Sequence, residues 1–178
     1  LEIDFISYGL MMKELEKGDS SVRVISSIQT SLVMFAIYSF GDEHQKSIYL
    51  PKLASGDLLG SFAMSEPNYG SDISNLKTHF SIHGDKLVIN GSKLWIGNAE
   101  NADLSIVWAR NEKDQVQGII VDKDDITNFQ STTIKRKWSF RSSYTGELFF
   151  NDSEVSLRQL LPLTSSIKNA YECLNIGR

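Results

Sequence analysis

The sequence predicts an α+β fold, with a helical N-terminal part followed by a β-sandwich or β-barrel and then by the start of another helix. Three observations lead to this prediction. From Ile3 to about Leu53 the apolar residues recur at helical spacing, and turn residues are sparse. After Gly56 the apolar period changes to two, with turn signals every 8–12 residues or so. Helical spacing returns from Ser165 or Ser166.

The composition narrows the class of protein. The chain has 178 residues, of which 41% are hydrophobic and 22% charged, which is typical of a globular protein rather than a disordered one. The net charge of -4 disfavours a nucleic-acid partner, because such binding relies on neutralising phosphates. The longest apolar run, Leu32–Tyr38, is too short to cross a bilayer, so no membrane span is expected. The single Cys173 cannot form an intrachain disulfide, which favours a reducing compartment.

Two helices are expected at the start of the chain. The first has an apolar face running from Ile3 to Leu15 and ends at Gly18. The second begins at Asp19 or Ser20, whose side chains can cap free backbone N–H groups, and ends at Gly41. This second helix is apolar nearly all round. It should therefore pack against neighbours on several sides, and the chain supplies few of them.

The β part is expected to contain short strands joined by tight turns. We predict a two-residue hairpin at Asn90-Gly91, because both residues tolerate the positive φ that such a turn needs. The final helix should carry Ile167, Ala170 and Leu174 on one face. The predicted strands are 58–64, 76–82, 86–90, 93–97, 104–109, 116–122, 130–136 and 146–151.

The segment 62–72 is the first candidate for chemistry. Turn residues follow the predicted strand, and Ser65, Ser71 and Asp72 place hydroxyl and carboxylate groups beside exposed backbone N–H donors. Such a loop can hold a polar cofactor edge or a phosphate. An ordinary β-loop with local side-chain turns has the same composition, so the pattern alone leaves both interpretations open.

Two further features each have a structural and a functional interpretation. Trp95 falls in a predicted strand, where an indole packs in the core more often than it serves as a cofactor platform. A basic cluster with interleaved aromatic residues is compatible with single-stranded nucleic-acid binding. The acidic pI favours a solvated or ion-paired barrel edge instead. The cluster consists of Lys135, Arg136, Lys137 and Arg141 with Trp138 and Phe140. The sequence shows no zinc-ligand spacing and no nucleophile motif.

Taken together, several motifs resemble the acyl-CoA dehydrogenase family in order and spacing, over nearly the whole chain. They are Ser65-Glu-Pro-Asn-Tyr-Gly-Ser-Asp72, Asn90-Gly-Ser-Lys-Leu-Trp-Ile-Gly-Asn98, Ala102-Asp103, Trp108-Ala-Arg110 and Lys137-Trp-Ser-Phe-Arg-Ser-Ser-Tyr-Thr-Gly146. The resemblance implies three parts: the end of an N-terminal helical domain at 1–57, a β-barrel middle domain at 58–162, and the start of a C-terminal helical domain at 163–178. It also implies a homotetramer.

The resemblance further implies an FAD cofactor and an acyl-CoA substrate. The residues matching the family's flavin site are Phe62, Ala63, Met64, Ser65, Gly70, Ser71, Trp95, Ile96 and Gly97. Among them Trp95 would cover one face of the flavin, and Ser71 would also touch the acyl-CoA. In this family a glutamate removes the α-proton while a hydride passes to the flavin. That glutamate is expected beyond Arg178, so none of the residues here, Glu172 included, is expected to be the base, and the 178-residue chain alone should be inactive.

Within the family the sequence is most similar to the glutaryl-CoA dehydrogenase branch, which converts glutaryl-CoA to crotonyl-CoA. Arg23 falls where that branch keeps an arginine for the distal carboxylate, a pairing that suits the fixed guanidinium fork. Val24 replaces a polar neighbour of that arginine. The alternative for Arg23 is an ordinary surface arginine at a helix start.

Gly97 is a second departure from the family pattern, which has Thr or Ser there. Some short-chain acyl-CoA oxidases share this glycine, so three functions stay open: a dehydrogenase that passes electrons to electron-transfer flavoprotein, an oxidase that uses oxygen, and a non-catalytic fragment. The expected compartment is the mitochondrial matrix in a eukaryote, the cytoplasm in a bacterium, or the peroxisome for an oxidase.

Overall fold

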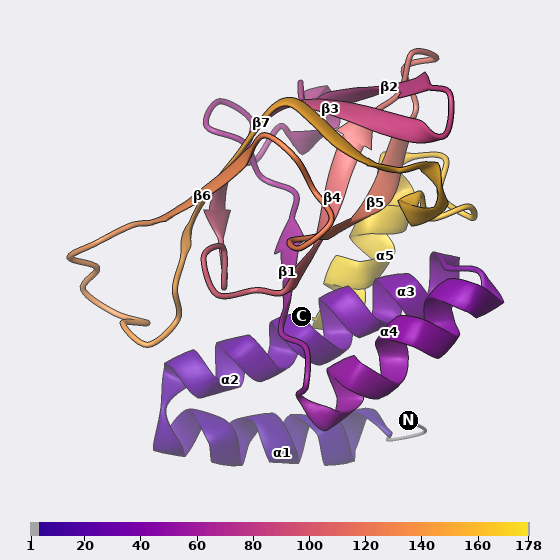
Figure 1. Cartoon of the computed structure of the whole chain (residues 1–178). Coiled ribbons are helices and arrows are strands. Elements are labelled where there is room, and N and C mark those ends of the chain that lie inside the picture. Colours follow the sequence, from indigo (N-terminus) through magenta and orange to yellow (C-terminus); the bar gives the residue numbers. More distant parts are fainter. Residues whose placement is uncertain (1–3, 178) are drawn as a thin grey trace.

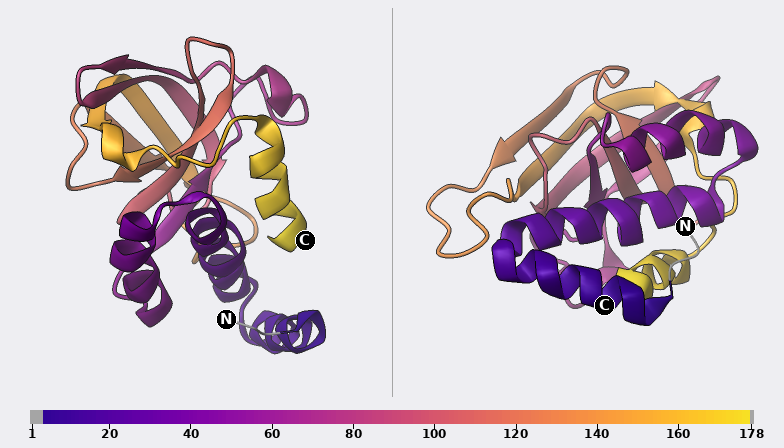
Figure 2. Two further views of the ribbon diagram at one scale, coloured as in Figure 1. Left: turned by 90° about the vertical axis from the view of Figure 1, so that its right-hand side faces the viewer. Right: turned by 90° about the horizontal axis from the view of Figure 1, so that it is seen from below.

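The computed structural model describes residues 4–177 and places a layer of helices under a strongly curled sheet (Figure 1). The sheet is a half-barrel, and the last helix lies against the same side of it as the N-terminal helices (Figure 2). The helices are α1 (Phe5–Gly18), α2 (Ser20–Ser27), η1 (Ile28–Met34), α3 (Phe35–Phe40), α4 (Glu43–Ser55) and α5 (Ile167–Gly177), with short turns η2 (Ile73–Asn75) and η3 (Leu157–Gln159). The strands are β1 (Gly60–Ala63), β2 (His79–His83), β3 (Lys86–Ile96), β4 (Leu104–Arg110), β5 (Val116–Asp122), β6 (Phe129–Thr133) and β7 (Gly146–Ser156).

The two predicted N-terminal helices are confirmed, and the second is capped at its start as expected. Asp4 accepts hydrogen bonds from the backbone N–H groups of Ile6 and Ser7, and Asp19 accepts one from Ser21. Ile3, the first residue of the predicted apolar face, lies outside the described residues. The structure adds a π-helical stretch, η1, in the middle of the continuous helix from Ser20 to Phe40. Such stretches occur frequently at functional sites.

The continuous helix Ser20–Phe40 is long and apolar enough to cross a membrane by length and composition, which the count of uninterrupted apolar residues missed. Core helices of folded proteins also meet these length and composition criteria, so meeting them is weak evidence for a membrane span. Val33, Ala36 and Ile37 are fully buried against the sheet and α5. Packing of this kind is what a helix in a folded core shows.

Gln29 joins this helix to the elements around it. Its side-chain amide donates to the carbonyl oxygens of Leu53 at 2.9 Å and Leu58 at 2.7 Å, and its side-chain oxygen accepts from the backbone N–H of Gly60 at 2.8 Å. A Cβ added at Gly60 would lie 2.6 Å from a methyl group of Val33, so β1 crosses the helix at a distance that only glycine allows. The helix is therefore held firmly against the first strand.

The sheet order is β1-β4-β2-β3-β7-β6, with β5 also paired to β4. The predicted strand regions are largely confirmed, and the sheet is mixed, because β1 pairs with β4 in parallel over Gly60–Ala63 while most other strand pairs are antiparallel. A single parallel bridge joins β2 to β4. Two apolar clusters follow from this curl: one between the sheet and the helices, around Trp108 and Ile37, and one inside the curl, around Phe80 and Ile119.

The predicted hairpin at Asn90-Gly91 is wrong, because both residues lie inside the long strand β3. The chain turns instead at Gly84, whose φ is 63°. Gly91 has a φ of 136°, and a Cβ there would lie 2.7 Å from the Cα of Thr78. The ladder between β3 and β7 shifts register between Ile89 and Gly91. Gly91 therefore allows a register shift in the ladder and a close approach to the Thr78 backbone, and it does not form a turn.

Candidate functional site

Trp95 stands out because its side chain is 64% exposed although it lies near the end of a strand. Its neighbours Leu94 and Ile96 pair with Glu147 and Gly146 of β7, so Trp95 is the extra residue of a bulge. Its φ of 63° is strained for a bulky residue. A bulge redirects a side chain, and backbone strain concentrates at functional sites. The interpretation of Trp95 as a core residue is therefore wrong.

Ser65 lies beside this tryptophan. The backbone N–H of Leu94 donates to the Ser65 carbonyl oxygen at 2.9 Å, which fixes the chain after β1 against the residue before Trp95. The Ser65 side chain is half-buried. Within residues 4–177, neither its backbone N–H nor its hydroxyl makes a hydrogen bond. An exposed indole with unpaired hydrogen-bonding groups beside it suits a flat ring ligand whose edge carries polar atoms.

The rest of the predicted loop is mostly exposed, except for the buried Glu66 and the half-buried Tyr69, and local hydrogen bonds order it. Glu66 and Tyr69 exchange two backbone hydrogen bonds, of 3.1 and 3.2 Å. Hydrogen bonds from the side chains of Asn75 and Ser74 lower the pKa of the Asp72 carboxyl. Gly70 and Ser71 are exposed, and a Cβ at Gly70 would meet no atom within 4 Å. The loop therefore leaves open space over Gly70.

Four of the predicted flavin residues face the core through their side chains. Phe62 packs on Trp108 with ring centroids 5.9 Å apart. The side chains of Ala63, Met64 and Ile96 are at most 6% exposed. These residues could reach a ligand only through their backbone. The structure thus brings Ser65 and Trp95 together. That these residues bind FAD stays a prediction.

Gly97 has a packing explanation. A Cβ at this position would lie 2.4 Å from the terminal methyl group of Ile28 in η1. The helix therefore passes close under the strand end that carries Trp95. The terminal methyl group of an isoleucine can shift, so a larger residue at Gly97 strains this contact without excluding it.

We expect Gly97→Ala to lower the free energy of unfolding by roughly 1–3 kcal/mol, because the added methyl group overpacks the contact with Ile28. Ile28→Val removes the opposing methyl group and should recover part of this loss. Urea unfolding of the single and double variants measures the coupling, which should exceed about 0.5 kcal/mol. Additive effects of the two substitutions would show that the contact with Ile28 is not the reason why a larger residue at position 97 destabilises the protein.

Arg23 lies on α2, five residues and about 7.5 Å of helix before Ile28. Its Nε donates to Glu16 Oε2 at 2.8 Å, and its side chain is 32% exposed. The Arg23 and Ser20 side chains donate to Glu16 and lower the pKa of its carboxyl. The guanidinium is thus paired by a residue that the sequence analysis did not select. Val24 follows as a half-buried residue.

The ion pair between Lys93 and Glu66 was not predicted, although Glu66 lies in the motif 65–72 and Lys93 in the motif 90–98. The two side chains are 0% and 5% exposed, and the Lys93 ammonium lies 2.9 Å from Glu66 Oε1. One signal was available. Lys93 has the strand parity of the buried Leu87 and Ile89, a position where a charged residue requires a partner.

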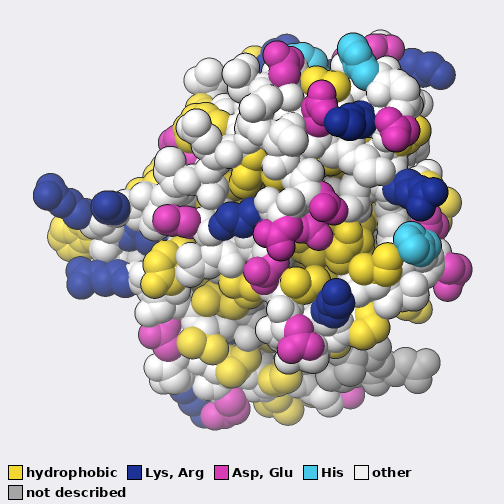
Figure 3. All heavy atoms as spheres, viewed as in Figure 1, with side chains coloured by type: hydrophobic (Ala, Val, Ile, Leu, Met, Phe, Trp, Pro, Cys, Tyr) yellow, Lys and Arg dark blue, Asp and Glu magenta, His cyan; other side chains and the backbone are white. Residues whose placement is uncertain are grey.

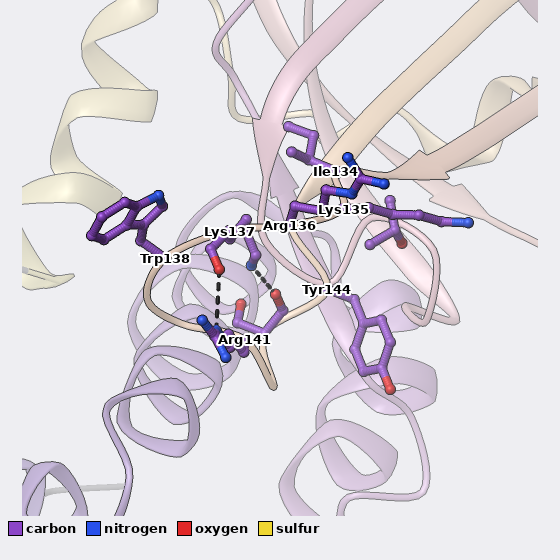
Figure 4. Close-up of a pocket in the computed structure, with 9 residues that line it drawn as sticks. Ile134, Lys135, Arg136, Lys137, Trp138, Arg141 and Tyr144 are labelled. Carbon is purple, nitrogen blue, oxygen red and sulfur yellow. Dashed lines mark hydrogen bonds between the residues drawn. The ribbon is translucent and has the colours of Figure 1, made fainter.

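The basic cluster forms the loop between β6 and β7, which projects from the body of the protein (Figure 3). Lys137 donates to carbonyl oxygens inside the loop, including that of Phe140 at 2.7 Å. No salt bridge involves Lys135, Arg136, Lys137 or Arg141 within residues 4–177, and Trp138 is 98% exposed. The loop borders a wide, open hollow of about 690 Å³. Its side chains point in different directions, so they do not converge on one ligand (Figure 4).

Glu172 and Cys173 are neighbouring residues of α5 with different surroundings. Glu172 is exposed on α5, as expected of a solvated helix glutamate. Burial raises the pKa of the Cys173 thiol to about 12, so this cysteine stays protonated and unreactive at neutral pH. Among the residues the structure describes, no group of three or more His, Cys, Asp or Glu could hold a metal ion.

Comparison with known proteins gives consistent results over the whole chain. Residues 1–57 match the N-terminal domain of acyl-CoA dehydrogenases, and residues 61–153 match the middle domain of the same family. An acyl-CoA dehydrogenase of Bacillus subtilis is 38% identical over 98% of this chain and 47% of its own length. The rat mitochondrial short/branched chain specific acyl-CoA dehydrogenase is also 38% identical, over 99% of this chain and 42% of its own.

A solved structure agrees with these sequence matches. The glutaryl-CoA dehydrogenase of Mycobacterium smegmatis, in complex with FADH2, superposes with a TM-score of 0.94 at 39% identity, covering 98% of this chain and 45% of that one. The chain thus spans about half the length of the relatives it matches. The domain boundaries at 57/58 and 162/163 stay a prediction.

Proposed function

The chain belongs to the acyl-CoA dehydrogenase family, and from this premise we propose that it forms the FAD-binding and acyl-binding part of an enzyme that oxidises and decarboxylates glutaryl-CoA. The observation that carries the flavin part is Trp95, exposed by its bulge beside the free N–H of Ser65. When bound, FAD supplies the acceptor for the hydride leaving the acyl chain.

The residues of this chain have binding and positioning roles in that reaction. The exposed face of Trp95 would stack on the flavin ring, and the Ser65 N–H and hydroxyl would hydrogen-bond to its polar edge. Gly70 leaves room for the backbone to approach the cofactor, and Ser71 follows on the same exposed turn. None of these side chains can take up a proton at neutral pH. From the resemblance to the family, the base that removes the α-proton is proposed to lie outside residues 1–178.

The proposal of glutaryl-CoA as substrate rests on Arg23. Arg23 lies on the helix that reaches Gly97 through Ile28, and its guanidinium pairs with Glu16 of α1. A guanidinium binds a carboxylate in a fixed fork, which suits the distal carboxylate of a glutaryl chain. Electron-transfer flavoprotein is the proposed electron acceptor, and a homotetramer the proposed assembly. Relatives specific for other acyl chains are equally similar in sequence, so this part needs a direct test.

The alternative of an oxygen-using acyl-CoA oxidase is favoured by Gly97 alone. The close approach of Ile28 explains this glycine without reference to the electron acceptor. The dehydrogenase therefore remains the better-supported proposal. Comparing the rates at which oxygen and electron-transfer flavoprotein reoxidise the reduced protein separates the two.

We expect Trp95→Ala to raise the Kd for FAD by roughly tenfold, because losing a stacked aromatic face costs on the order of 1–2 kcal/mol. The measurement is a titration that follows the quenching of flavin fluorescence. Trp138→Ala is the matched control, since it removes an indole that is 98% exposed on the projecting β6–β7 loop. Equal effects of the two substitutions, or no FAD binding by the unchanged protein, would contradict the proposed flavin site.

A further inference from the structure

Lys93 and Glu66 form a buried ion pair directly behind the proposed flavin site. Both charges are removed from water, which is costly unless each is paired and hydrogen-bonded. Burial lowers the pKa of the Lys93 ammonium to about 8. Burial alone would raise the pKa of Glu66, but the charge of Lys93 and two backbone N–H groups outweigh it and lower that pKa. A buried ion pair often adds no net folding stability compared with apolar residues of similar size. The position of this pair therefore needs another explanation.

The hydrogen bonds of the pair converge on the segment that carries Ser65. Besides Glu66, the Lys93 ammonium donates to the carbonyl oxygen of Met64 at 3.0 Å. The Glu66 carboxylate accepts from the backbone N–H groups of Lys77 at 2.7 Å and Thr78 at 2.8 Å, which anchors it to the start of β2. The pair thus ties the chain on both sides of Ser65 to strands β2 and β3.

The contact with Met64 has an electronic consequence. The Met64 carbonyl and the Ser65 N–H belong to the same peptide group. An ammonium on the oxygen draws electron density through the conjugated amide, which makes the N–H a stronger donor. This N–H has no acceptor within residues 4–177. The cation and the free donor therefore lie at the two ends of one polarised peptide.

We propose that Lys93 is a positioning residue for the flavin: held by Glu66, it polarises the Met64–Ser65 peptide so that the Ser65 N–H binds the polar edge of the reduced flavin more strongly than that of the oxidised flavin. This proposal rests on the proposed function. A flavin gains electron density on its pyrimidine edge when it is reduced, and a stronger donor there favours the reduced form. Lys93 should therefore raise the reduction potential of the bound flavin.

The first test removes the charge without leaving one partner buried alone. In the double variant Glu66→Gln/Lys93→Met, the potential of bound FAD should fall by about 30 mV, the two-electron equivalent of a tenfold change. The matched control is Glu154→Gln/Lys86→Met, the same change at an exposed ion pair whose lysine also lies on β3 and whose glutamate lies on β7, which should leave the potential unchanged. An unchanged potential in the folded, flavin-loaded double variant would overturn the proposal.

The second test leaves the ion pair intact, so it does not depend on how the charge variants fold. The chain has 4 methionines, so ¹³C-carbonyl labelling of methionine gives a simple infrared spectrum in which Met64→Leu identifies the Met64 band. FAD binding should shift this band, because an acceptor on the Ser65 N–H strengthens the hydrogen bond at the other end of the peptide. A band that does not move would overturn the proposal. Failure of FAD to bind would instead contradict the proposed function.

Discussion

Replacing Lys93 by Met while Glu66 stays in place is expected to lower the free energy of unfolding by about 3–5 kcal/mol. The substitution leaves a carboxylate, 5% exposed, without its cation in the interior. The carboxylate must then stay charged in a poorly solvated place or take up a proton and weaken its bonds to Lys77 and Thr78. Denaturant unfolding followed by circular dichroism measures the loss.

Lys86→Met is the control for this prediction. Lys86 lies on the same strand and pairs with Glu154, but the two side chains are 52% and 40% exposed. Exposed pairs contribute about 1 kcal/mol or less, so this substitution should have little effect. A similar loss at both lysines would show that burial of the Lys93 pair does not determine its contribution.

The sequence predicted the helices well, because apolar periodicity and capping residues are local signals. Asp19 caps the second helix as expected, and the change of period after Gly56 falls where helix α4 gives way to β1. The π-helical stretch η1 was not predicted. It lies where the helix meets α5 and the crossing strand at Gly60, and such tertiary contacts leave no periodic signal in the sequence.

The two errors in the sheet have one cause. Gly91 is followed by more strand because β7 pairs along the whole length of β3, which overrides the turn preference of Asn90-Gly91. Trp95 faces outward because the extra residue of a bulge reverses the side-chain parity. A bulge depends on the partner strand, so neither feature can be derived from the residues of β3 alone.

The candidate site was only partly predictable for a similar reason. Motif resemblance selected Ser65, Gly70 and Trp95, whose exposure suits a ligand. It could not show that Phe62 and Ile96 face the core, because membership of a motif does not specify which side of the strand a residue occupies. The Glu16–Arg23 pair joins residues on successive helices, α1 and α2, and its geometry depends on the angle between them.

Arg23→Ala in the complete enzyme is expected to reduce kcat/KM for glutaryl-CoA by a factor on the order of 10² or more. The reason is that the distal carboxylate of the substrate loses the cationic partner that the proposed function gives it. Butyryl-CoA has no such carboxylate and should lose little. Lys17→Ala is a matched control, because it removes an exposed cation paired with Glu14 on the neighbouring helix, and it should change neither rate.

The contact with Glu16 sharpens this prediction. Glu16 neutralises Arg23 in the structure, so a substrate carboxylate must share the guanidinium with it or displace it. Glu16→Gln should therefore lower the KM for glutaryl-CoA, because the full positive charge becomes available, and should leave butyryl-CoA unaffected. Equal losses on both substrates in Arg23→Ala would make Arg23 a structural residue. No loss on either would make it a surface residue and would favour the oxidase over the glutaryl-CoA enzyme.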